Sequence, residues 1–134
     1  MFNKKKTLVI LTTIIVFSLL MSGMVSAQET TFLSIATGGT SGTYYPIGGA
    51  IAKVLNENID AMNASAQTTG ASVENSRLIY NQRVELAILQ NDIANYAVNG
   101  QNQFEGNQVN NMQGIAVLYP EVIQIVVRND ADIN

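Results

Sequence analysis

Three short runs with the length of β-strands alternate along the chain with segments of helical periodicity. The first and third are apolar, and the second, AMNASAQT, alternates only weakly. The predicted strands are residues 32–36, 61–68 and 85–89. The first predicted helix begins near Pro46, and the next two span residues 73–82 and 93–99. This alternation predicts an α/β lobe with a largely parallel sheet and right-handed crossovers. The third run is nearly continuous in apolar character, which favours a central position in such a sheet.

The first of these helices has one predicted buried face. Its members recur at helical spacing and are Ile47, Ala50, Ile51, Val54 and Leu55. Gly48 and Gly49 lie in the same helix, where each glycine costs up to about 1 kcal/mol relative to alanine. We therefore expect both glycines to be kept for close packing on the sheet.

Polar and glycine residues mark the ends of the later elements. Ser72 is predicted to cap the N-terminus of the second helix, and Asp92 that of the third. Gly100 follows the third helix, at the position that glycine favours after a helix end. The rest of the chain is predicted to form a polar surface loop and two β-rich runs, residues 100–111, 114–119 and 122–128.

Each predicted strand is followed by a polar loop, the first of which reads TGGTSGTYYPIGG at residues 37–49. Ligands of parallel sheets bind beyond the carboxyl ends of the strands, and glycine-rich turns leave amides free to face an anion. The candidate binding residues for a small carboxylate are Gly39, Thr40, Ser41, Gly42, Thr43, Tyr44, Ala71, Ser72, Val73, Gln90, Asn91 and Asp92. The alternative is ordinary strand-to-helix loops, in which Tyr44 or Tyr45 packs in the interior and Asp92 only caps a helix.

Residues 1–27 have the order of regions found in a secretory signal peptide. Lys4–Lys6 are basic, the next run is apolar, and Val25–Ala27 offer small residues to a signal peptidase. We predict cleavage between Ala27 and Gln28, and therefore an exported protein. The alternative is an uncleaved anchor, because residues 7–24 are just long enough to cross a bilayer.

Composition narrows the chemistry that is available. The 134 residues include no histidine and no cysteine, so a Ser-His-Asp or Cys-His arrangement cannot be assembled. Removal of the leader would leave four basic and ten acidic residues, a net charge of −6, which disfavours nucleic acid as a partner. We expect a binding protein without a cofactor or metal rather than an enzyme, with Arg77 as a solvated surface residue.

The segment TGGTSGTYYPIGGAIA, residues 37–52, resembles the opening of TRAP-transporter solute receptors of the TAXI family. Three later stretches are similar to the same family in the same order: TTGASVEN at 68–75, LAILQND at 86–92 and IAVLYPEVIQIVVR at 115–128. The resemblance implies an exported type II periplasmic-binding-protein fold with three-layer lobes. Such a receptor delivers a small organic carboxylate or amino acid to the TRAP permease subunits, without a reaction or cofactor. It also implies ligand contact at Gly70 and at Tyr119, and Tyr119 and Glu121 in LYPE match a segment near the cleft of the family.

A type II binding protein closes two lobes on its ligand. We expect residues 28–134 to supply the first lobe and part of the crossing to the second, either as a fragment of a longer gene product or as a truncated product. The alternative function is an exported interaction module that pairs its edge strand with another chain.

Overall fold

The computed structural model describes residues 4–21 and 28–131, which fall into two units. The first unit, Met1–Thr30, contains the helix α1 (Lys4–Met21). In the described ranges, no helix combines the length and the apolar character that crossing a membrane requires. The predicted cleavage site after Ala27 and the end of the alternative span at Met24 lie outside the described residues.

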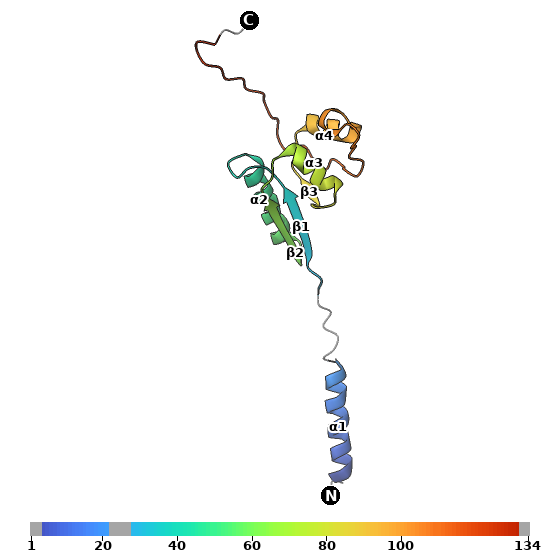
Figure 1. Ribbon diagram of the computed structural model, residues 1–134. Helices are drawn as coiled ribbons and strands as arrows, with labels where there is room; N and C mark the ends of the chain where they lie inside the picture. Colours follow the sequence, from blue (N-terminus) through green and yellow to red (C-terminus); the bar gives the residue numbers. More distant parts are fainter. Residues whose placement is uncertain (1–3, 22–27, 132–134) are drawn as a thin grey trace. The chain divides into compact units, whose positions relative to one another are not determined.

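The second unit, Thr31–Asn134, is an α/β lobe, as the alternation of strands and helices predicts (Figure 1). Its elements are β1 (Thr31–Ala36), α2 (Tyr44–Asn58), β2 (Met62–Gln67), α3 (Ser72–Tyr80), β3 (Leu86–Ala87), α4 (Asn91–Asn99) and the 3-10 helix η2 (Asn102–Phe104). Within the described residues the strands form one parallel sheet in the order β2-β1-β3, flanked by helices.

The central strand of this sheet is β1. It pairs with β2 from Thr31 to Ala36 but with β3 only at Ile35 and Ala36. The prediction of a central third strand is therefore wrong, because β3 is short and lies at the edge. The apolar character of this run reflects the burial of Ile88 and the packing of Leu86 against the core that contains Ile35.

Small residues let α2 approach the sheet closely. Gly48 and Ala52 are the buried residues of this helix, and a Cβ on Gly48 would overlap the Thr37 Cγ2 atom. A Cβ on Gly49 would meet no atom within 4 Å, so the expectation of close packing is confirmed for Gly48 and wrong for Gly49.

The buried face of α2 differs from the predicted one. Ile51 and Leu55 pack against the core of Ile35, Ala52 and Ala64, but Val54 is 58% exposed. Ala50 is also exposed. Because the sheet is narrow and Gly48 brings the helix close to it, the contact is made by the stripe through Gly48 and Ala52.

The polar stretch 100–111 contains a second small core. Phe104 and Val109 are each 1% exposed and pack with Ala97 of α4. Gly100 adopts the left-handed conformation expected after a helix, with φ of 62°. Two apolar anchors thus hold a mostly polar loop against α4.

Neither of the β-rich runs at 114–119 and 122–128 forms a strand. Ile115, Val117, Ile123 and Val126 are all more than four-fifths exposed. A strand requires a neighbouring backbone to accept its hydrogen bonds, and in the described part of the chain these runs have none.

Candidate functional site

Backbone hydrogen bonds bring the loops after all three strands together at the carboxyl edge of the sheet. The N–H of Thr37 donates to the Gln67 carbonyl at 3.0 Å, and that of Thr69 to the Gly38 carbonyl at 3.4 Å. On the other side, the N–H of Ile88 donates to the Ala36 carbonyl at 3.0 Å. Because β1 lies between its two neighbours, the loop that follows it contacts both other loops.

Asn75 on α3 connects the three loops through its side chain, which is fully buried. Its Nδ2 donates to the carbonyl oxygens of Thr37 at 2.7 Å and Ile88 at 2.8 Å. Its Oδ1 accepts a hydrogen bond from the Thr69 hydroxyl at 2.6 Å. Sequence reasoning missed this role, and the available signal was an amide residue at the end of the second loop motif.

Ser72 provides a second connection and is not the predicted helix cap. The N-cap position belongs to Ala71 and has no side-chain cap. The Ser72 hydroxyl instead accepts a hydrogen bond from the Gln90 N–H at 3.0 Å, which joins the second loop to the third. The Ser76 hydroxyl donates to the Ser72 carbonyl at 2.9 Å and is itself buried.

Several loop amides that were expected to face an anion are already bonded to the protein. The Gly70 N–H donates to Glu74 Oε2 at 2.6 Å, the Ala71 N–H to Thr69 Oγ1 at 3.1 Å, and the Gly42 N–H to the Gly39 carbonyl at 2.9 Å. Ala71 has a φ of 65°, a strained conformation for a residue with a side chain. These bonds stabilise the turns but leave those amides unable to hold a ligand.

The N–H groups of Gly39, Thr40 and Ser41 remain available. Within the described part of the chain these three amides have no hydrogen-bond acceptor, and their residues are exposed. The tip of the first loop is therefore a candidate cradle for an anion.

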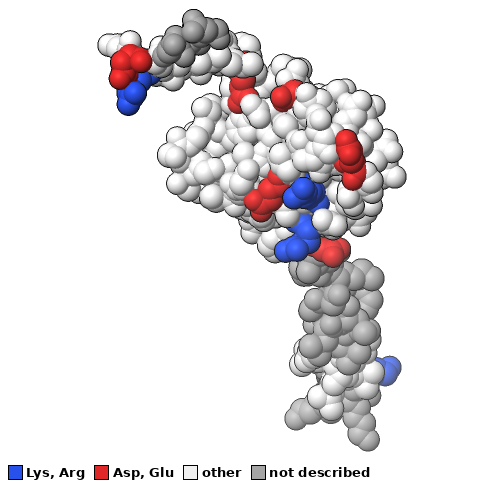
Figure 2. Space-filling view, turned by 45° about the horizontal axis from the view of Figure 1, so that its top comes forward, with Lys and Arg blue, Asp and Glu red and all other residues white. Residues whose placement is uncertain are grey.

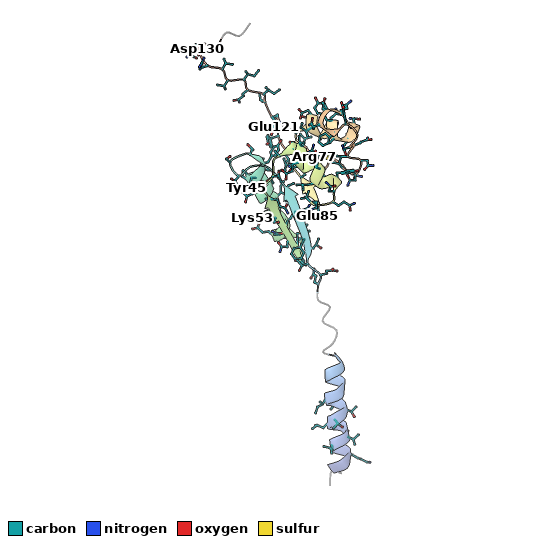
Figure 3. All side chains as sticks on the ribbon, viewed as in Figure 1. Tyr45, Lys53, Arg77, Glu85, Glu121 and Asp130 are labelled. Carbon is teal, nitrogen blue, oxygen red and sulfur yellow. The ribbon has the colours of Figure 1, made fainter. Side chains whose placement is uncertain are left out.

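A group of hydroxyls surrounds the start of α2. Burial raises the pKa of Tyr44 to about 12, contact with the Ser72 hydroxyl opposes this shift, and Glu121 adds to it. The Tyr119 hydroxyl donates to Glu121 Oε1 at 3.0 Å, and burial followed by this carboxylate raises the pKa of Tyr119. We call Tyr44, Ser72, Tyr119 and Glu121 the hydroxyl cluster. It contains three of the predicted site residues and Glu121, which Figure 3 labels.

Other predicted site residues lie outside this cluster. The side chain of Val73 packs with the second core beside Phe104. Asp92 is exposed in the first turn of α4 and is not the N-cap residue, which is Gln90, but its Oδ1 accepts a hydrogen bond from the Ile93 N–H at 2.8 Å. The described contacts place neither Asn91 nor Asp92 against the hydroxyl cluster.

The hollow beside Arg77 lies apart from the loops. It is lined by Arg77, Tyr80, Asn81, Gln103, Phe104, Asn107 and Val109. Arg77 is exposed, as expected for a surface residue. Figure 2 shows that most of the face in view is uncharged, with acidic and basic side chains scattered over it.

The Tyr44→Phe variant is expected to lose the late step in the ultraviolet titration of tyrosinate. A pKa raised from 10.0 to about 12 means that the phenol contributes stability below pH 10, which is lost as the pH rises toward 12. Urea unfolding across this range should therefore show a weaker pH dependence in Tyr44→Phe. The control Tyr80→Phe, on the exposed end of α3, should keep the late step. A late step of unchanged amplitude in Tyr44→Phe would contradict the assignment, since the pKa of Tyr119 is also raised and can leave only part of it.

An open parallel sheet flanked by helices, with its loops gathered at the carboxyl edge, is the architecture of a periplasmic-binding-protein lobe. Comparison with protein-family models gives the particular family. The model of the NMT1-like family matches residues 35–134, most of the chain, and the chain belongs to that family. The family is of the periplasmic-binding-protein type and consists of binding proteins rather than enzymes. The resemblance seen in the sequence is confirmed at this level, and TAXI membership stays a prediction.

Proposed function

We propose that this chain provides the solute-binding lobe of an exported TRAP-transporter receptor of the TAXI type, and that it binds a small organic anion or amino acid. One observation carries the proposal: side-chain hydrogen bonds of Asn75 and Ser72 fix the loops, while the N–H groups of Gly39, Thr40 and Ser41 stay unbonded at the tip of the first loop. Donors held in this way suit a carboxylate.

In this proposal the protein binds the solute without a chemical reaction. The amides of the first loop donate to the solute carboxylate, and the phenols of Tyr44 and Tyr119 bind its polar groups. Asn75 and Ser72 keep the loops in place before the solute arrives, which lowers the entropy cost of binding. Closure against a second lobe would then remove water from the solute.

The same proposal includes export, with removal of residues 1–27, and delivery of the solute to TRAP permease subunits. Membership in a binding-protein family that is typically exported supports it. The order of basic, apolar and small residues in the leader supports it independently.

The test is thermal unfolding of the protein secreted from the full-length gene, against a panel of small carboxylates and amino acids. A solute at a hundredfold excess over its Kd should stabilise the folded state by about 2.7 kcal/mol, which is several degrees in Tm for this size. Tyr44→Phe should reduce the shift, whereas Tyr80→Phe should not. The mass of the secreted protein reports cleavage after Ala27. A cooperative transition that no solute moves would refute binding by this chain.

One observation favours a second candidate function, pairing with another chain. The apolar residues at 115–127 are exposed, and in the described chain β3 pairs on one side only. Unpaired edges of this kind favour strand addition. A stable dimer in sedimentation, together with no response to any solute, would support this candidate over the first.

A further inference from the structure

The edge of β1 that faces β3 is covered only at its end. β3 begins at Leu86 and pairs with β1 at Ile35 and Ala36, so residues 31–34 have no strand on that side. Val84, which precedes β3, is buried and takes no part in the ladder. We call residues 31–34 on the β3 side the open edge of β1.

The open edge combines an unpaired amide with an exposed aromatic ring. The N–H groups of Thr31 and Thr37 donate to carbonyls on the β2 side. Because direction alternates along a parallel strand, the backbone groups of Phe32 and Ser34 face the β3 side. In the described part of the chain the Phe32 N–H has no acceptor, and the Phe32 side chain is 70% exposed. An edge of this kind is a template for a further strand.

Glu85 occupies the open edge at its other amide. Its Oε2 accepts a hydrogen bond from the Ser34 N–H at 2.7 Å, across 51 residues of sequence. Glu85, labelled in Figure 3, immediately precedes β3, so its side chain takes the position that a strand carbonyl would have. In the ranges that the structure describes, no lysine or arginine forms an ion pair with this carboxylate. The open edge therefore contains a negative charge that no ion pair neutralises.

We propose that Glu85 closes the open edge of β1 against strand pairing with a second copy of this chain. Two copies present the same edge to each other, so a two-fold axis would pair the edges and bury both Phe32 side chains. The carboxylate prevents this because it already holds the Ser34 N–H and sets an acceptor against the incoming carbonyls. The inference concerns self-association and is independent of solute binding.

Sedimentation velocity of the protein secreted from the full-length gene tests this. Glu85→Ala should lower the dissociation constant of the dimer at least about tenfold below that of the unaltered protein. Glu85→Gln keeps an acceptor for the Ser34 N–H but removes the charge, and should lower this constant at least about threefold. The control Glu105→Ala removes an exposed carboxylate after η2 and should leave the constant within about twofold.

A second substitution tests whether the dimer uses the open edge. Adding Phe32→Lys to Glu85→Ala restores a charge there, and should return the dissociation constant to the unaltered value. The exposed position of Phe32 lets the fold accept lysine, and the Tm of each variant shows that it is folded. An unchanged constant in both Glu85→Ala and Glu85→Gln would overturn the inference. Tighter association that persists with Phe32→Lys would place the contact on another surface and also overturn it.

Discussion

Replacing Asn75 with alanine is expected to destabilise the second unit by about 3 kcal/mol or more. The substitution leaves the carbonyls of Thr37 and Ile88 and the hydroxyl of Thr69 without their partner. Each buried polar group that loses its hydrogen bond costs about 1–3 kcal/mol. Urea unfolding followed by circular dichroism measures the loss as a change in the midpoint at constant slope.

Two further variants separate the hydrogen bonds from the volume of the side chain. Asn75→Asp keeps the size but sets a carboxylate oxygen against two carbonyls, so it should be at least as destabilising as alanine near neutral pH and recover partly in acid. Asn81→Ala removes an exposed bond to the Arg77 carbonyl and should change stability by less than about 0.5 kcal/mol. Similar losses in Asn75→Ala and Asn81→Ala would show that Asn75 does not connect the loops.

Alanine at Gly48 and alanine at Gly49 are expected to change stability in opposite directions. In an exposed helix, glycine to alanine stabilises by about 1 kcal/mol, and Gly49→Ala should do so because its Cβ meets nothing within 4 Å. The Cβ of Gly48→Ala would overlap Thr37 Cγ2, and Thr37 cannot rotate away without breaking its 2.6 Å bond to the Gln67 carbonyl. Such overpacking costs about 1–3 kcal/mol.

Because the two glycines are adjacent in one helix, each serves as the control for the other. Thermal unfolding of both variants under one condition measures the difference. If Gly48→Ala were as stable as Gly49→Ala, then α2 would not approach the sheet as closely as the structure shows. The Gly48 substitution should also weaken solute binding, because Thr37 begins the first loop.

The sequence predicts much of the fold because its signals are local. Periodicity and turn residues alone located β1, β2 and the helices to within a few residues, and Gly100 marked a helix end correctly. The predictions failed where the structure of a segment depends on a neighbouring strand. The run 114–119 has the composition of a strand but has no neighbouring backbone among the described residues. Of residues 85–89, Leu86 and Ala87 form the strand, which pairs on one side only.

The sequence predicted which loops lie together at the candidate site, but not the hydrogen bonds within and between them. Parallel strands put their loops at one edge, so the glycine-rich loop and the start of α3 were identified correctly as neighbours. Which atoms face a ligand depends on hydrogen bonds between distant residues. Ser72 was expected to cap its own helix, yet its hydroxyl is bonded to Gln90, and Glu74 takes the amide of Gly70.

The sequence by itself determined the α/β class, the three loops and the lack of histidine or cysteine chemistry, because composition and periodicity are properties of neighbouring residues. Only the tertiary structure decided that Asn75 connects the loops, that Gly48 but not Gly49 touches the sheet, and which loop amides stay free. The physical reason is that a hydrogen bond or a close contact depends on two groups at once. Asn75 and Thr37 are 38 residues apart, and folding alone brings them together.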